Sequence, residues 1–487
     1  MAETAPQRAE VVVVGAGTAG GLVAHRLAQQ GRQVLVVEAG SVGALPPLIR
    51  SVNAAQVHLE SDRWWNRRRL QGEAVRGGLR WGPGMDVGRG LGGSSAINYM
   101  VLCPGDEADF RGVSLAGNRW PAAIIDVLKR MPPGVPVHIP DPGPIARAYG
   151  QRLAQQGWPS FIDEHGHRIA PSRVGLGSGT RPSHELDSDG FVPAALAASD
   201  DQRWVSADLL GRPRSGNQEI GSGGSDAGLV VVQGEVKQLL VGTRAGEAEV
   251  NGVRLADGTM IVAPSVVLCG GAVLNLALLA RSGLLPPHYR PPMRNHPGIA
   301  LAVEIDRDQQ IGNGPRVAPA ITALHRWSSG VTGHPHDLMT LVVEDAGSGA
   351  DQRRYGALLL MLAHSTGSSE KDRIALVEGI RALGGMIGGD PTGVTCLSGM
   401  GIYADQDGLT FDSLLGMNNE QIKQWCELNR APVNHLVGTC EPLVDLGQGG
   451  VFKQVKGLRI LDGSVLPSLP SGTPQLAILA MSESLLA

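Results

Sequence analysis

The stretch VVVVGAGTAG at residues 11–20 decides the fold class of this chain. Its four valines are β-branched and apolar, which is typical of a strand buried on both faces of a parallel sheet. Gly15, Gly17 and Gly20 form a GxGxxG pattern directly after that strand and at the start of a helical segment. In this pattern the first glycine makes a tight turn, the second lets the backbone approach a pyrophosphate, and the third lets helix and strand pack closely.

The residues that follow complete a strand–helix–strand unit. We expect a helix from about residue 20 to residue 30, stopped by Gly31, and a second strand over residues 34–37 that ends at Glu38. This order predicts a doubly wound sheet in an α/β fold. The helix start, with Thr18 and Ala19, offers unpaired N–H groups and a positive dipole end to phosphates.

Glu38 indicates which nucleotide the turn would bind. An acidic side chain at this strand end binds ribose hydroxyls, whereas a 2′-phosphate calls for arginine. The pattern does not by itself separate FAD from NAD. The alternative is a glycine-rich turn that holds no ligand.

Composition limits the remaining classes. The chain has 487 residues, which is long for one core and predicts two domains. Hydrophobic residues make up 42% and charged residues 18%, so a packed protein is expected rather than a disordered one. The formal net charge is −4 and the basic residues are dispersed, which gives no support to a nucleic-acid partner.

Five cysteines without a CxxC pair argue against a disulfide framework and a zinc site, and they favour a reducing cytoplasm. The N-terminal residues lack an apolar signal segment. Because no apolar run is long enough to cross a bilayer, we expect no transmembrane segment and a cytoplasmic protein. A peripheral membrane contact stays open.

Further along the chain, strands are expected over residues 229–232, 236–241 and 262–268. Residues 211–228 are rich in glycine and serine and predict a loop, while residues 131–144 are rich in proline and predict a connector.

His334, His336 and Asp337 form a compact trio that could suggest a metal. No further ligand stands at a suitable spacing, so a surface loop is the favoured interpretation and no metal is expected.

A second glycine block, GRGLGGSSAINYM at residues 88–100, adds the next constraint. Gly90 and Gly93 allow main-chain N–H groups to face a ligand, and Ser94 and Asn98 add short polar side chains beside them. An ordinary turn before a helix is the alternative. The block resembles the first signature of the glucose-methanol-choline (GMC) oxidoreductases.

Other segments resemble that family in the expected order. They are residues 204–208, 235–237, 266–272, 278–283, 295–297, 434–440 and 458–467. The resemblance implies an α/β fold in which a Rossmann-like FAD-binding domain carries an inserted α+β substrate domain. It assigns residues 1–115, 200–300 and 430–487 to the discontinuous FAD domain, and residues 116–199 and 301–429 to the substrate domain and its connectors.

The resemblance also implies roles for single residues. His435 matches the catalytic histidine, while Thr473 stands where the family usually has asparagine or histidine. His296 lies in a matched turn and is expected to be structural. Ile97 stands where some members attach the flavin through histidine, so FAD is expected to be non-covalent. The remaining implied cofactor contacts are Val236 at the adenine, Asp462 and Gly463 at the flavin chain, and Pro474 and Gln475 near the flavin pyrimidine.

The implied reaction moves a hydride from an alcohol carbon to flavin. Histidine suits the accompanying proton removal because its unperturbed pKa is about 6.5. A hydrogen-bonded core histidine is the alternative for His435. Two other classes stay open: a family member that binds FAD without oxidising alcohols, and a flavin reductase that uses NAD(P)H. The electron acceptor, which could be oxygen, a quinone or a redox partner, is not determined.

Overall fold

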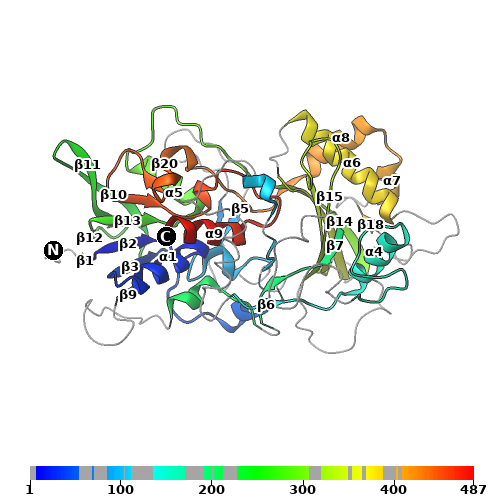
Figure 1. The fold of residues 1–487 in the computed structure, drawn as a ribbon, viewed down its shortest axis with the longest axis horizontal. Coiled ribbons are helices and arrows are strands. Elements are labelled where there is room, and N and C mark those ends of the chain that lie inside the picture. Colours follow the sequence, from blue (N-terminus) through cyan, green and yellow to red (C-terminus); the bar gives the residue numbers. More distant parts are fainter. Residues whose placement is uncertain are drawn as a thin grey trace.

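The computed structural model shows two lobes side by side, each built on its own large sheet (Figure 1). It describes residues 7–53, 57, 68–70, 85–103, 105–110, 135–169, 190–199, 202–211, 228–305, 320–348, 354–364, 369–387, 402–403 and 409–486. The expected loop over 211–228 therefore lies almost wholly outside the described residues, as do residues 131–134 of the expected connector and Cys396. The other four cysteines are buried and free.

The first lobe holds the predicted doubly wound sheet. Its strand order is β20-β21-β22-β13-β2-β3-β9, and the strands from β22 to β9 run parallel. The bounds are β2 Val11–Val14, β3 Val34–Glu38, β9 Leu229–Gln233, β13 Ser265–Leu268, β20 Val444–Asp445, β21 Val451–Phe452 and β22 Leu458–Ile460. Strands far apart in sequence thus form one sheet, because buried apolar runs pair wherever the topology brings them together.

Among the described residues, three α-helices and a smaller sheet complete this lobe. The helices are α1 Thr18–Gln29, α5 Gly271–Arg281 and α9 Pro474–Leu486. The smaller sheet has the order β1-β12-β11-β10, with β1 Gln7–Arg8, β10 Val236–Arg244, β11 Glu247–Leu255 and β12 Met260–Val262. Gly31 ends α1 with a φ of 81°, as expected from the sequence.

One expected strand proves to be two. Residues 262–268 divide into the end of β12 and the whole of β13, which belong to different sheets. Pro264 stands between them. Proline lacks the N–H that a ladder needs, so the chain changes sheets at this point.

The second lobe is an antiparallel sheet covered on its outer face by helices (Figure 1). Its order is β18-β14-β17-β16-β15-β7, and β19 also pairs with β14. The strands are β7 Gly190–Pro193, β14 Pro297–Ile305, β15 Ile321–Trp327, β16 Leu338–Ser348, β17 Arg354–Leu362, β18 Ile402–Tyr403 and β19 Ala431–Pro432; the helices are α4 Pro144–Gln155, α6 Glu370–Ile387, α7 Phe411–Leu415 and α8 Asn419–Asn429.

Alternation along β15 sets the two faces of this sheet. Ala323 and Trp327 are buried in the helix-covered core, whereas Leu324 packs in the core shared with the first lobe. Because side chains alternate along a strand, Arg326 points the same way as Leu324, toward the first lobe.

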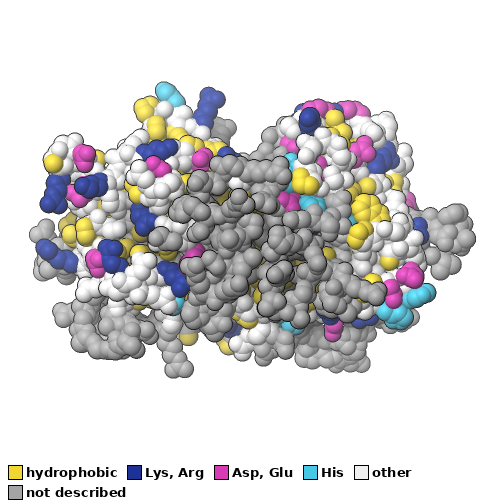
Figure 2. Space-filling model, in the orientation of Figure 1, with side chains coloured by type: hydrophobic (Ala, Val, Ile, Leu, Met, Phe, Trp, Pro, Cys, Tyr) yellow, Lys and Arg dark blue, Asp and Glu magenta, His cyan; other side chains and the backbone are white. Residues whose placement is uncertain are grey.

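The surface of the described residues carries mixed charge. Basic and acidic side chains are interspersed over both lobes in the face that Figure 2 shows. Among the described helices, none is long and apolar enough to span a bilayer.

Candidate active site

The first glycine motif has the geometry that its sequence predicts. Gly15 has a φ of 98°, which favours glycine, and its N–H donates to the Val37 carbonyl at 2.8 Å. A Cβ on Gly20 would lie 1.9 Å from the Gly15 carbonyl oxygen. Only glycine therefore lets α1 pack this closely on β2.

The two glycine blocks meet backbone to backbone. A Cβ on Gly93 would lie 2.8 Å from the Gly17 Cα, and the Gly92 N–H donates to the Ala16 carbonyl at 2.8 Å. Gly17 caps α1 without a side-chain hydrogen bond, and the first turn carries no acidic residue. The arrangement leaves bare backbone around the start of α1, which is the kind of surface that binds phosphate.

Glu38 joins the two blocks. Its Oε2 accepts the Ala16 N–H and its Oε1 accepts the Gly40 N–H, both at 2.8 Å. Burial raises the pKa of this carboxyl, and hydrogen bonds from Ala16, Gly40 and Gly90 oppose that rise. Each oxygen of a carboxylate can accept more than one hydrogen bond, so ribose hydroxyls can still bind here.

A buried amide near α9 supplies a further test of fit to a cofactor. Asn98 Nδ2 donates to Gln475 Oε1 at 2.6 Å, while Asn98 Oδ1 accepts the Met100 N–H at 3.0 Å. Gln475 Nε2 is buried without a partner in the described part of the chain. Because a buried donor without an acceptor is unfavourable, Gln475 fits a site where a bound group supplies one.

Of the other expected cofactor residues, some lie on turns or at the start of an element, whereas Asp462 is buried. Gly90 has a φ of 146°, and Ser94 is exposed beside it. Val236 begins β10 and Pro474 begins α9.

Asp462, by contrast, faces inward. Its Oδ2 accepts from Gly271 N and Asn275 Nδ2 at 2.6 and 2.8 Å, and its Oδ1 accepts from the Ser464 N–H and hydroxyl at 2.8 and 2.6 Å. Four bonds fill a carboxylate, so Asp462 shapes the turn that begins at Gly463.

Two histidines meet between the lobes. His435 Nδ1 and His296 Nδ1 are 2.8 Å apart, with the rings nearly perpendicular at 84°. His296 Nε2 lies 2.9 Å from both the Ala363 and the Pro470 carbonyl oxygens. His296 is fully buried and His435 is half-buried.

These contacts assign the tautomers of the pair. Two carbonyls at His296 Nε2 require a proton on that nitrogen, which leaves His296 Nδ1 as an acceptor. His435 must then donate from Nδ1, and its Nε2 carries the lone pair. The sequence led us to expect a structural role for His296 in a turn, and it did not indicate the contact with His435. Its presence in a family-like segment was the available signal.

Burial keeps both rings neutral. It lowers the pKa of His296 to about 4, against the opposing effect of the two carbonyls. Burial also lowers the pKa of His435 well below its ordinary value, and the neighbouring His296 adds to that shift. The His435 ring is therefore neutral at neutral pH, which is the form that a general base requires.

Thr473 is held by the main chain. Its hydroxyl donates to the Val101 carbonyl at 2.6 Å and accepts the Cys103 N–H at 3.3 Å. A hydroxyl has one proton, so Thr473 has only a lone pair left to offer a substrate. A supporting role in catalysis stays a prediction for that lone pair alone.

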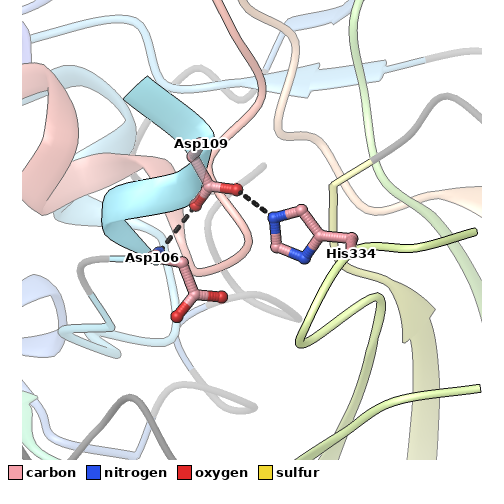
Figure 3. Close-up of side chains that lie close together, drawn as sticks. All are labelled: Asp106, Asp109 and His334. Carbon is pink, nitrogen blue, oxygen red and sulfur yellow. Dashed lines mark hydrogen bonds and ion pairs between the residues drawn. The ribbon is translucent and has the colours of Figure 1, made fainter. Parts of the chain in front are cut away.

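The trio at residues 334–337 does not form the surface loop that we expected. His336 and Asp337 are buried, and His334 is 13% exposed. Figure 3 shows His334 reaching from the β15–β16 loop to Asp109, with Asp106 beside it. The sequence prediction failed because the partners of His334 and His336 lie 225 and 230 residues away along the chain.

Comparison with known proteins finds similarity to one family. Residues 356–482 match the family model described as GMC oxidoreductase. A pyridoxine 4-oxidase of Microbacterium luteolum is 25% identical over 56% of this chain and 52% of its own length. An oxygen-dependent choline dehydrogenase of Brucella melitensis is 26% identical over 61% of this chain and 51% of its own. The chain thus spans about half the length of these two relatives.

Another relative and two solved structures extend the match. An uncharacterised GMC-type oxidoreductase of Mycobacterium tuberculosis is 25% identical over 98% of this chain and 75% of its own length. Formate oxidase of Aspergillus oryzae covers 99% of this chain and 98% of its own, with a TM-score of 0.75 and 16% identity. Pyridoxine 4-oxidase from Mesorbium loti covers 98% of both chains, with a TM-score of 0.71 and 20% identity.

A Rossmann-type lobe joined to an antiparallel sheet, with a histidine pair between them, defines a two-lobed α/β fold. Over residues 356–482 the chain is similar to the GMC oxidoreductases, and its fold is that of the formate oxidase and pyridoxine 4-oxidase structures.

Proposed function

We propose that the chain binds FAD non-covalently and oxidises a CH–OH group of a small alcohol. The observation that carries this proposal is the tautomer of the histidine pair, which gives His435 Nε2 a lone pair in a neutral ring. Relatives named for oxidation of choline and pyridoxine support an alcohol as the substrate class.

The residues present fit FAD. The bare backbone at Gly15, Gly17 and Gly93 accommodates the pyrophosphate, Glu38 accepts from the ribose, and Gln475 Nε2 gains an acceptor. Ile97 occupies the place of the histidine that links flavin in some members, which supports non-covalent binding. We also propose that residues 1–115, 200–300 and 430–487 form the FAD domain and residues 116–199 and 301–429 the substrate domain, with β14 and β19 carrying the second lobe's sheet across these bounds to Pro297 and to residues 431–432.

His435 performs the proton transfer. Its Nε2 takes the hydroxyl proton, the carbon–hydrogen bonding pair leaves as hydride, and the carbon–oxygen single bond becomes a carbonyl. FAD, when bound, supplies the two-electron acceptor for that hydride. His296 fixes the ring of His435 through the Nδ1 contact, so the lone pair keeps one direction.

The acceptor that reoxidises the flavin is oxygen, a quinone or a redox partner, and we propose a cytoplasmic protein because four described cysteines are free. The second candidate is an FAD-binding member that does not oxidise alcohols. It is favoured only by Thr473, whose hydroxyl is bound to the main chain.

Anaerobic reduction tests the proposal. The purified yellow protein is mixed with a panel of alcohols, sugars and sterols, and loss of flavin absorbance is followed. Bleaching by an alcohol in the parent, and its loss in His435→Ala, is the expected result. A yellow protein that no alcohol bleaches supports the second candidate, and bleaching by NAD(P)H alone overturns alcohol oxidation.

A further inference from the structure

A cluster of five buried or largely buried polar side chains lies where the two lobes meet, and we call it the junction cluster. Its members are Asp106, Asp109, Arg326, His334 and His336. Arg326 Nη2 and His336 Nδ1 lie 2.7 and 2.9 Å from Asp106 Oδ2, and His334 Nε2 lies 2.9 Å from Asp109 Oδ1 (Figure 3). Donor groups thus face the carboxylate oxygens, which makes the cluster a hydrogen-bonded ion-pair network and not a cage of ligands for a cation.

The junction cluster forms hydrogen bonds with the loop around Ser471, which belongs to the first lobe. Asp109 Oδ2 accepts both the N–H and the hydroxyl of Ser471, at 2.7 and 2.8 Å. The same hydroxyl also lies 2.8 Å from Asp106 Oδ2. A Cβ on Gly472 would lie 2.3 Å from the Cys103 carbonyl oxygen, so this loop has no room to shift toward residue 103.

The two carbonyls that accept from His296 Nε2 belong to Pro470, in the loop around Ser471, and to Ala363, which directly follows β17. The Pro470 carbonyl directly precedes Ser471, which is bonded to Asp109. The Ala363 carbonyl directly precedes His364, whose ring stacks on His334 at 4.5 Å with an interplanar angle of 12°. Both carbonyls that fix the His296 proton are therefore attached to residues that the junction cluster holds.

We propose that the junction cluster is a positioning network that sets the tautomer of His435. It does so by holding the Pro470 and Ala363 carbonyls against His296 Nε2, at 2.9 Å each. The proposal rests on the proposed function of His435 as the base. Asp109 is its key positioning residue, because it contacts both the loop at Ser471 and the imidazole of His334.

Asp109→Asn is the sharpest perturbation, because it changes charge and donor pattern at nearly constant shape. His334 Nδ1 accepts the His336 N–H at 3.1 Å, so His334 must carry its proton on Nε2. Asparagine has one acceptor end and one donor end. It cannot accept from both His334 and Ser471, so one of these two contacts breaks.

A second carboxylate, on the sheet of the second lobe, provides a matched control for the Asp109→Asn substitution. Glu344 on β16 accepts the Ile145 and Ala146 N–H groups at 3.0 and 2.9 Å and the Thr322 hydroxyl at 3.0 Å. It contacts neither Ser471 nor the cluster in these bonds. Glu344→Gln therefore makes the same carboxylate-to-amide substitution as Asp109→Asn, and it leaves the residues that hold the Pro470 and Ala363 carbonyls unchanged.

The experiment has two readouts on the FAD-loaded protein. The first is the rate constant of anaerobic flavin reduction by the best alcohol. The second is the protonation pattern of ring-labelled histidine by nuclear magnetic resonance, with His435→Ala used to assign the signals. We expect Asp109→Asn to slow reduction by about 10- to 100-fold and to add a His435 form protonated at Nε2. Glu344→Gln should leave the tautomer as in the parent.

Two results overturn the proposal: equal slowing by Asp109→Asn and Glu344→Gln, or slowing by Asp109→Asn with the histidine signals unchanged. Should Asp109→Asn fail to fold, Ser471→Ala removes only the hydroxyl shared by the two carboxylates, and the same two readouts apply. If no alcohol reduces the parent flavin, the proposed function fails. The histidine signals still decide the positioning role, because they need no turnover.

Discussion

Removal of the His435 imidazole is the most direct test of the active-site assignment. His435→Ala deletes the Nε2 lone pair. His296 keeps a lone pair on Nδ1, but the two carbonyls at its Nε2 fix the ring, so that lone pair stays where it met His435 Nδ1 and does not take the place of His435 Nε2. A general base contributes about 10²–10⁴-fold. At about 1.36 kcal/mol per tenfold change, the barrier to flavin reduction should rise by roughly 2.7–5.4 kcal/mol.

The same substitution should spare the fold and the flavin. It leaves His296 Nδ1 without its partner at 2.8 Å, which costs about 1–3 kcal/mol of unfolding free energy. The backbone N–H of residue 435 still donates to Asn295 Oδ1 at 2.8 Å. The protein should therefore remain yellow.

Stopped-flow reduction under anaerobic conditions measures the effect. His288→Asn serves as the control, because His288 is exposed and asparagine tolerates its φ of 58°. A flavin-loaded His435→Ala protein that reduces at the parent rate would refute the assignment of the base and place the proton transfer elsewhere.

Three further predictions follow from named contacts. The value of kcat/KM should rise with pH through an apparent pKa below 6.5 and then stay level, because His435 acts when neutral and its pKa is lowered; a fall across that range in a pH series would contradict it. Glu38→Ala should weaken FAD binding in a titration of apoprotein, since both oxygens also hold the turn at Ala16 and Gly40, and unchanged affinity would remove Glu38 from the site. Thr473→Val should lower the free energy of unfolding by about 0.5–1.5 kcal/mol in a denaturant series, because the hydroxyl proton of Thr473 is bonded to the Val101 carbonyl. For the same reason it should slow flavin reduction at most tenfold. Slowing equal to that of His435→Ala would make Thr473 a full catalytic partner.

The sequence predicts the first lobe well because its signals are local. The valine run, the glycine turn and the strand ending at Glu38 occupy fewer than thirty consecutive residues, and β2, α1 and β3 form there. The observed α1 begins at Thr18, two residues before the expected start, because the helix opens inside the glycine motif. Pro264 was the local sign that residues 262–268 are two strands.

The site is less predictable because its contacts are long-range. His296 and His435 are 139 residues apart, and His334 and Asp109 are 225 apart. Neither hydropathy period nor spacing reports such pairs. The buried charge of Arg326 beside Asp106 appears in sequence as one of three polar residues in an otherwise apolar strand, which does not identify its partner.

Two helices that pack together in the first lobe come from opposite ends of the chain, and this has a consequence for biosynthesis. Helix α1 is made at residues 18–29, yet its neighbour α9 is made at residues 474–486, where Glu483 lies 2.8 Å from Arg26. At about 5–20 residues per second, tens of seconds separate the two events on the ribosome. Until then the side of α1 that packs on α9 lacks its native partner, so we expect the yield of folded protein to depend on what covers this side before the last helix emerges.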